Sequence, residues 1–253
     1  MNEFQQQAIT AARNAREIIL EHYKSSLDID LKSDQTPVTI ADREAENVIR
    51  ETLLSAFPDH GMYGEEHGWH NGDAEYLWLV DPIDGTKSFI NGYGFFSTQI
   101  ALLHKGQLIL GVSCAPAMNE IAWALHDAGA FLNSEALQVS AIGDLSQAAI
   151  STGNIQTLAG SDNWSTLGEI LASCNRTRGY GDFYHYHRLA AGQIDAVIES
   201  DVNILDIAAL TVIVREAGGV ITDLDGRPIG LETCSVLAAN PVLHTKLLSC
   251  LKG

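Results

Sequence analysis

The chain has 253 residues, of which 46% are hydrophobic, and it carries a formal net charge of −17. This length provides a substantial core for one large domain or for two closely packed ones. The acidic balance argues against nucleic acid as a general partner, because no basic stripe is present to neutralise phosphates, and the lack of any run of about 18 apolar residues argues against a membrane span.

Two helices are predicted before the first strand. Residues 1–5 are polar and lack the apolar core of a signal peptide, so we expect a cytoplasmic protein. The four widely spaced cysteines form no Cys-x-x-Cys pair, which favours reduced thiols over a disulfide framework or a zinc site. Residues 3–24 place apolar side chains at helical spacing, and a second helix is expected to begin after an N-cap at Thr39 and to end before Pro58.

The remainder of the first half is predicted to form an antiparallel sheet, whereas the second half alternates strands and helices. The expected strands of the sheet lie at 76–81, 97–104, 107–114, 120–126 and 129–133. The second half is expected to contain strands at 147–152, 194–199, 219–223 and 235–239, and helices at 163–173, 182–192, 206–217 and after Pro241. This change predicts two sub-domains, residues 1–145 and residues 146–253, packed as one compact unit with the site between them.

The most informative segment is 79–86, in which an apolar strand leads into two aspartates three residues apart. The proline between them fixes φ, and the glycine after them permits a conformation that other residues resist, so Asp81 and Asp84 are expected to converge just past the strand end. A helical turn is predicted at 87–90, and its free N–H groups suit an anion. Carboxylates for a hard divalent cation beside amides for a phosphate predict metal-assisted phosphate chemistry.

Three acidic blocks, in this order, resemble a known family. Glu65 and Glu66 precede the Asp-Pro-Ile-Asp-Gly-Thr segment at 81–86, and Asp206 follows much later in a run of small apolar residues. The set resembles the inositol monophosphatase superfamily of Mg²⁺-dependent, lithium-sensitive phosphatases over nearly the whole chain. The resemblance implies an αβαβα layered sandwich, two or three bound Mg²⁺ ions, inhibition by Li⁺ and a homodimer, whereas periodicity alone indicates only a mixed α/β chain.

The same resemblance implies a ligand set for two metals. Glu65, Asp81 and the Ile83 carbonyl correspond to ligands of the first metal. Asp81, Asp84 and Asp206 correspond to ligands of the second. Taken without the resemblance, Asp81 and Asp84 are also compatible with turn-forming aspartates. Glu65 is likewise compatible with a solvated loop acid, and Asp206 with the N-cap of the following helix.

Thr86 and Asp42 are the candidate groups for activating water, beside Glu65. The resemblance implies that Thr86 positions or deprotonates the water and that Asp42 hydrogen-bonds to Thr86, although a first-turn acid that favours the helix dipole is an alternative for Asp42. Gly85 and Thr86 are candidates for binding the phosphate, and Lys32 is either a further one or a surface lysine. Because no cysteine or serine lies in a nucleophile motif, we expect direct attack by water without a phospho-enzyme.

Two acidic residues of the second half are the candidates for binding the leaving group. Glu199 aligns with the family's acid that holds a substrate hydroxyl, and Asp182 replaces a small residue of the sugar-alcohol members. Two carboxylates favour a cationic leaving group, and this pattern looks most like the histidinol-phosphate phosphatase branch, an activity of histidine biosynthesis. The alternative for Asp182 is a helix cap. His185 and His187, spaced by two, are expected at a polar surface or interface rather than at a metal.

Other functions remain open from the sequence. A small phosphorylated metabolite is the expected partner, but inositol phosphates, sugar phosphates and adenosine 3′,5′-bisphosphate are alternatives to histidinol phosphate. A regulatory binding protein with incidental phosphatase activity is the alternative from another class. The intact set of candidate ligands argues against an inactive enzyme.

Overall fold

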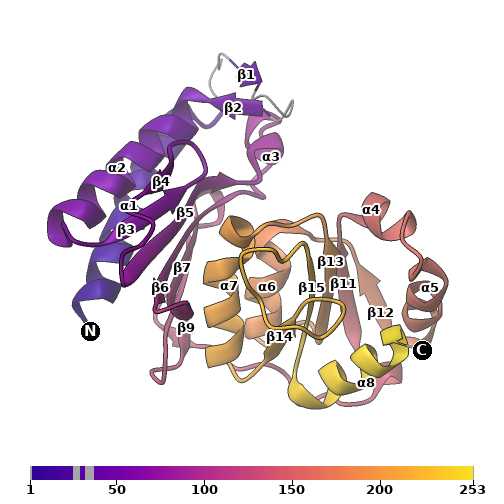
Figure 1. Ribbon diagram of the computed structural model, residues 1–253. Helices are drawn as coiled ribbons and strands as arrows, with labels where there is room; N and C mark the ends of the chain where they lie inside the picture. Colours follow the sequence, from indigo (N-terminus) through magenta and orange to yellow (C-terminus); the bar gives the residue numbers. More distant parts are fainter. Residues whose placement is uncertain (1, 25–28, 32–36, 253) are drawn as a thin grey trace.

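A computed structural model of the protein describes residues 2–24, 29–31 and 37–252 (Figure 1). The first half contains α1 (Glu3–His22), β1 (Ile29–Leu31), β2 (Pro37–Thr39), α2 (Ile40–Ala56), β3 (Gly61–Gly64), β4 (Gly68–His70), β5 (Tyr76–Asp84), α3 (Thr86–Ile90), β6 (Ser97–His104), β7 (Gln107–Ala115), β8 (Glu120–Leu125), β9 (Ala130–Leu132) and β10 (Glu135–Ala136). The second half contains β11 (Ala149–Gly153), α4 (Ile155–Ala159), α5 (Trp164–Ser173), β12 (Arg176–Arg178), α6 (Asp182–Ala190), β13 (Ala196–Ser200), α7 (Ile204–Glu216), β14 (Val220–Thr222), β15 (Ser235–Ala239) and α8 (Pro241–Lys252).

These elements stack in five layers, which confirms the predicted αβαβα sandwich (Figure 1). Helices α1 and α2 cover one face of an eight-stranded sheet with the strand order β10-β9-β8-β7-β6-β5-β3-β4. Helices α6 and α7 fill the space between that sheet and a five-stranded sheet with the order β12-β11-β13-β15-β14. Helices α4, α5 and α8 cover the outer face of the smaller sheet. The division into residues 1–145 and 146–253 stays a prediction.

The outermost helices pack through one face each. In α1 the alanines at 8, 11, 12 and 15 are fully buried, and their small side chains allow α1 to approach both α2 and the sheet.

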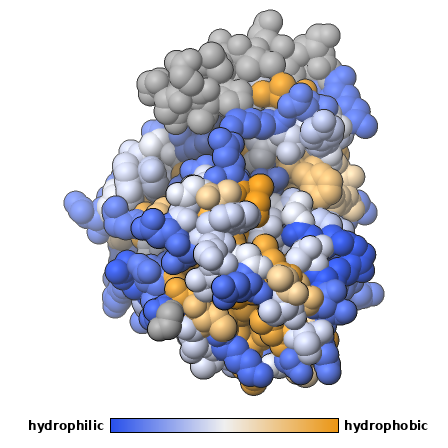
Figure 2. All heavy atoms as spheres, turned by 90° about the vertical axis from the view of Figure 1, so that its right-hand side faces the viewer, coloured by the Kyte–Doolittle hydropathy of each residue, from blue (hydrophilic) through white to orange (hydrophobic). Residues whose placement is uncertain are grey.

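At the other end of the sandwich, three exposed apolar side chains, Ile155, Trp164 and Val242, lie on α4, α5 and α8 respectively. The view of this side shows hydrophobic atoms interspersed among hydrophilic ones (Figure 2). Single exposed apolar residues of this kind are ordinary on a protein surface.

Helix α7 is the central element that positions the site. Ten of its side chains are buried, from Ile204 to Val214, because sheets lie on both sides of it. It approaches β7 so closely that a Cβ at Gly111 would collide with the backbone oxygen of Ala209, so glycine is required there. The packing places the first turn of α7 beside the end of β5. No helix among residues 2–24, 29–31 and 37–252 combines the length and hydropathy of a transmembrane span.

Several predicted boundaries differ from the structure. Helix α7 begins at Ile204 rather than at 206, and β5 continues through Asp84 instead of ending at 81. Strands β3 and β4 and helix α4 were not predicted, because segments of three to five residues are too short to show a periodicity. The end of α7 before Gly218, which has a φ of 86°, agrees with the predicted glycine stop.

Candidate active site

An irregularity in β5 brings the two aspartates of the central motif together. Asp81 pairs with Gln99 and Asp84 pairs with Ser97, so two residues on β5 lie opposite one on β6. In a regular strand, residues three apart point to opposite faces, and the extra residue of this bulge puts both carboxylates on one side. The predicted convergence is therefore produced within the strand rather than by a turn after it.

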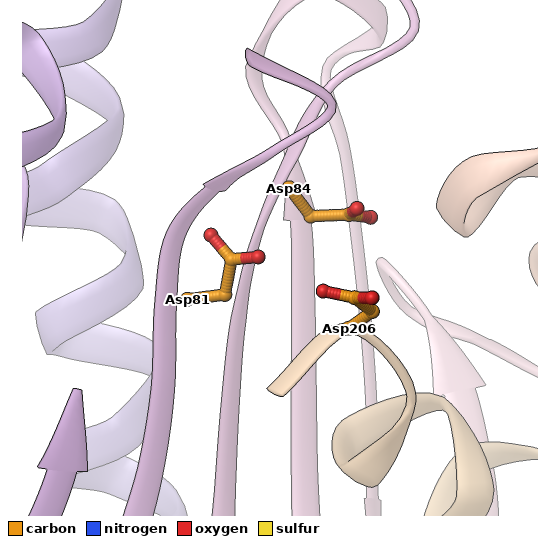
Figure 3. A group of neighbouring side chains, drawn as sticks. All are labelled: Asp81, Asp84 and Asp206. Carbon is orange, nitrogen blue, oxygen red and sulfur yellow. The ribbon is translucent and has the colours of Figure 1, made fainter. Parts of the chain in front are cut away.

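Asp206 completes a cluster with these two residues. Carboxylate oxygens of Asp81, Asp84 and Asp206 all lie within 4.8 Å of one another. Asp81 and Asp84 reach the cluster from β5 and Asp206 from the first turn of α7, and the three side chains face a common space (Figure 3). Asp206 is not the N-cap of α7, which corrects that alternative: Asn203 is the cap, and Asp206 follows three residues later and accepts from the Asn203 N–H at 2.8 Å.

Glu65 lies beside Asp81 because β3 and β5 run parallel. Gly64 pairs with Val80, and the Glu65 N–H donates to the Val80 carbonyl at 3.1 Å, so Glu65, the first residue after β3, lies next to Asp81 of β5. The turn that carries Glu65 is held by Glu46, a buried residue of α2. Glu46 accepts from the Glu66 N–H at 2.6 Å and from the His67 N–H at 3.1 Å.

The electrostatics of the cluster indicate a cation site. Burial, followed by the charges of Glu65, Asp84 and Asp206 and a hydrogen bond with Glu65, raises the pKa of Asp81 well above its usual range. Burial, followed by the charges of Asp182, Asp206 and other acids, does the same to the pKa of Asp84. Burial and neighbouring acids raise the pKa of Asp206 to about 7, against hydrogen bonds from Asn203 that lower it. Such carboxylates repel one another when they are ionised, and a bound cation would relieve this repulsion. All the ligand atoms are oxygens, which is the set that a hard divalent metal prefers.

Thr86 and Asp42 make the hydrogen bond that the family resemblance implies. The Thr86 hydroxyl lies 3.3 Å from Asp42 Oδ1 and 3.0 Å from the Ile83 carbonyl oxygen. Asp42 also accepts from the Thr39 N–H at 2.7 Å and from the Thr39 hydroxyl at 2.6 Å, so it is part of a capping box and contacts Thr86 at the same time. Gly85 begins α3 with a φ of 87°, and a Cβ there would lie 2.7 Å from the Phe95 carbonyl oxygen.

Asp182 and Glu199 lie next to the carboxylate cluster. A cavity of about 90 Å³ is lined by both of them and by Asp84 and Asp206. The cap alternative for Asp182 is wrong: α6 has Gly181 at its N-cap position with no side-chain cap bond, and Asp182 itself has a φ of 48°. A non-glycine residue in this region of the map stores strain, and such strain is commonly found at functional sites. Burial and the charge of Glu199 raise the pKa of Asp182 to about 6.

The histidines of α6 are buried, so the prediction of a surface or interface position is wrong for both. His185 lies between Ser151 and Glu199, and His187 lies between Ser113 and Glu120. Lys32 lies outside the described residues. The metal and phosphate roles of the predicted residues, including the Ile83 carbonyl and the Gly85 amide, stay predictions.

Three residues near the site were missed from the sequence. They are Glu46, which holds the turn of Glu65, and Ser151 and Tyr186, which belong to the surroundings of Glu199. Glu46 had a detectable signal, since it lies four residues after Asp42 on the face of α2 that also carries the buried Ile49. A charged residue on an apolar helix face requires a buried partner.

Comparison with known proteins identifies the family of this chain. The model of the inositol monophosphatase family matches residues 1–252. The chain is 34% identical to a histidinol-phosphatase of Chlorobaculum parvum, with 97% of this chain and 95% of that protein covered, and 35% identical to an inositol-1-monophosphatase of Mesorhizobium japonicum, with 90% and 87% covered. The structure of the extragenic suppressor protein suhB from Bartonella henselae superimposes with a TM-score of 0.90 at 32% identity, with 98% and 97% covered. The chain therefore belongs to the inositol monophosphatase family of phosphatases.

Proposed function

We propose that this protein is a Mg²⁺-dependent phosphatase that hydrolyses histidinol phosphate to histidinol. The observation that supports this substrate is a cavity lined by Asp182 and Glu199 together with Asp84 and Asp206 of the carboxylate cluster. A phosphate bound at the cluster would place its leaving group beside two further acids. Histidinol has an ammonium group and an imidazole, whereas inositol has neither, so this charge favours histidinol phosphate.

The acidic residues of the site would hold the metal ions that the hydrolysis requires. Glu65, Asp81 and the Ile83 carbonyl would hold one Mg²⁺, and Asp84 and Asp206 would join Asp81 at a second. Bound Mg²⁺ would supply charge for the phosphate oxygens and for activation of the attacking water.

Thr86 and Asp42 would orient the attacking water. The hydroxyl hydrogen of Thr86 has two acceptors within reach, Asp42 Oδ1 and the Ile83 carbonyl, so the hydroxyl oxygen keeps a lone pair free to accept a hydrogen bond from the attacking water and orient it. Because Asp42 is fixed by its own bonds to Thr39, the hydroxyl of Thr86 is held in one place. We expect in-line attack by water and no covalent intermediate.

The position of Asp182 supports a substrate role. Its carboxylate lines the same cavity as Glu199 and Asp84. The histidinol-phosphatase of Chlorobaculum parvum supports this ester, and the inositol-1-monophosphatase of Mesorhizobium japonicum supports inositol 1-phosphate as the competing one. We also propose that the protein is cytoplasmic and that it forms a homodimer. Light scattering after size exclusion tests the homodimer.

Steady-state kinetics on a panel of esters test the substrate. We expect kcat/KM to be higher for histidinol phosphate than for inositol 1-phosphate or sugar phosphates. In the Asp182→Asn variant the charge is lost while a residue tolerant of positive φ remains. This change should raise KM for histidinol phosphate by about ten- to a hundredfold, the equivalent of a charge-assisted contact, and spare p-nitrophenyl phosphate. Equal losses on both esters would make Asp182 structural, and faster turnover of inositol 1-phosphate by the unmutated enzyme would refute the substrate.

A further inference from the structure

Glu199 lies in a buried hydrogen-bond network that the metal chemistry does not use. The network consists of Glu199 on β13, His185 and Tyr186 on α6, and Ser151 on β11. We propose that His185 and Tyr186 are positioning residues, which fix the Glu199 carboxylate so that its Oε1 atom is presented to the leaving group and thereby set the preference among esters. The identity of that ester, histidinol phosphate, rests on the proposed function.

The two oxygens of Glu199 have different surroundings. Oε2 accepts from the Tyr186 hydroxyl at 2.6 Å and lies 3.0 Å from His185 Nε2. Within the described part of the chain, Oε1 accepts no hydrogen bond, although Glu199 is only 2% exposed and lines the cavity. Because Glu199 lines the cavity and no described residue donates to Oε1, this oxygen is available to a donor from a ligand.

A chain of donors fixes the orientation of His185. The Tyr180 N–H donates to Ser151 Oγ at 3.2 Å, and Ser151 Oγ lies 3.3 Å from His185 Nδ1. Because the carboxylate oxygen of Glu199 can only accept, the ring proton of His185 is assigned to Nε2, and the Ser151 hydroxyl hydrogen is then assigned to Nδ1. His185 therefore donates to Glu199 Oε2, and its ring cannot turn without losing both contacts.

Tyr186 donates in the same direction. Its hydroxyl is fully buried, and burial together with Glu199 raises its pKa well above the usual value, so it remains a donor at neutral pH. Two donors from consecutive residues of α6 thus converge on the same oxygen. Losing either leaves Oε2 with a single bond and allows the carboxylate to rotate.

The residue opposite Glu199 limits the carboxylate from the other side. Gly153 pairs directly with Glu199 across the parallel strands β11 and β13, and a Cβ at position 153 would collide with Oε1. The two bonds to Oε2 hold the carboxylate close to Gly153, so a larger residue at 153 has to displace Oε1 against those bonds. Gly153→Ala should therefore shift the same carboxylate while leaving both donor side chains in the protein.

His187 provides a matched control on the same helix. It is as fully buried as His185 and is also hydrogen-bonded at both ring nitrogens, at 3.0 Å to Glu120 and 2.9 Å to Ser113. Neither of these partners belongs to the Glu199 network. Replacement of His187 measures what the loss of a buried histidine does to α6 in general.

The test compares His185→Leu, His185→Gln, Tyr186→Phe, Gly153→Ala and His187→Leu by kcat and KM on histidinol phosphate and p-nitrophenyl phosphate. The glutamine amide nitrogen occupies a place near Nε2 and can still donate to Glu199. We expect His185→Leu and Tyr186→Phe to raise KM for histidinol phosphate about tenfold, the effect of one lost hydrogen bond, with kcat and the p-nitrophenyl phosphate kinetics retained. His185→Gln should restore most of the KM, and His187→Leu should leave the ratio between the two esters unchanged.

The outcomes separate this inference from the proposed function. If the unmutated enzyme prefers histidinol phosphate and His185→Leu, Tyr186→Phe and Gly153→Ala all keep that preference, the positioning role is refuted and the proposed function stands. Equal losses on both esters would likewise reduce the network to a structural one. If the unmutated enzyme prefers inositol 1-phosphate, the proposed function fails, and the positioning role is decided by whether the same variants raise KM for that ester.

Discussion

The first turns of α2 and α7 share one local structure but have different neighbours. Each helix begins with a capping box, Thr39 with Asp42 in α2 and Asn203 with Asp206 in α7. Among the described residues, the backbone and hydroxyl of Thr39 and the hydroxyl of Thr86 all donate to Asp42. Asp206 is bonded by Asn203 and otherwise faces Asp81, Asp84 and Glu65.

This difference teaches that the surroundings, rather than the motif, decide what a capping acid does. The α2 turn packs against donors, so Asp42 serves to hold a hydroxyl in place. The α7 turn packs against other carboxylates, so Asp206 adds negative charge that a cation must compensate. The following experiments break or sharpen this comparison, beginning with the largest expected effect.

Asp206→Asn should reduce activity far more than Asp42→Asn. The amide keeps the shape of the capping box but removes one charge from the cluster, and we expect a loss on the order of 10² or more in kcat, because the metals supply most of the charge stabilisation of the transition state. Asp84→Asn should behave like Asp206→Asn, and a chelator should abolish activity. Full activity in the presence of a chelator, or an unchanged kcat in either variant, would refute the metal mechanism.

Thr86→Ala and Asp42→Asn should affect kcat more than KM. We propose that the hydroxyl acts on the attacking water, an interaction realised mainly in the transition state, and general acid–base contributions of this kind are about 10²-fold. Asp42→Asn should show a milder defect, because it only orients Thr86. The measurement is the KM-against-kcat split, and a change confined to KM would make Thr86 a phosphate-binding residue instead.

Stability of the metal-free protein should fall as the pH rises through the cluster's titration. The pKa of Asp206 is raised from an ordinary value near 4 to about 7, so its stabilising contribution is present below about pH 4 and is lost by about pH 7. Added Mg²⁺ binds the ionised form and should therefore raise Tm more at pH 8 than at pH 5. Calorimetry of the protein with Mg²⁺ and with chelator checks this, and equal Mg²⁺ shifts at the two pH values would contradict it.

The smallest expected effects come from the caps themselves. Thr39→Ala and Asn203→Ala each remove a side-chain bond to the start of a helix, at 3.2 Å to the Ala41 N–H and 2.7 Å to the Leu205 N–H. Each loss is worth about 1 kcal/mol, or about 2–4 °C in Tm for a chain of this size. Asn203→Ala should in addition weaken Mg²⁺ binding in titration calorimetry, because Asp206 loses its orientation, and an unaltered affinity would separate the cap from the metal site.

Residues close together in the sequence carried the parts of the site that were predictable. The segment 81–86 brings two carboxylates and a glycine turn within six positions, so it could be recognised without knowledge of the packing. Most long helices and strands were also predictable, since their apolar periodicity extends over enough residues to be distinct. The bond between Thr86 and Asp42 was expected only through the family resemblance.

Only the tertiary structure decided the roles of groups that act across layers. The bulge that turns Asp84 to the side of Asp81 depends on pairing with β6, and the burial of Glu46 depends on the turn after β3. His185 looked like a surface residue because its partners, Ser151 and Glu199, lie on strands far from it in the chain. The sequence determined which chemical groups are present and how local segments fold. Packing of distant segments determined which of these groups are buried together, and burial is what converts an ordinary acid or histidine into part of a site.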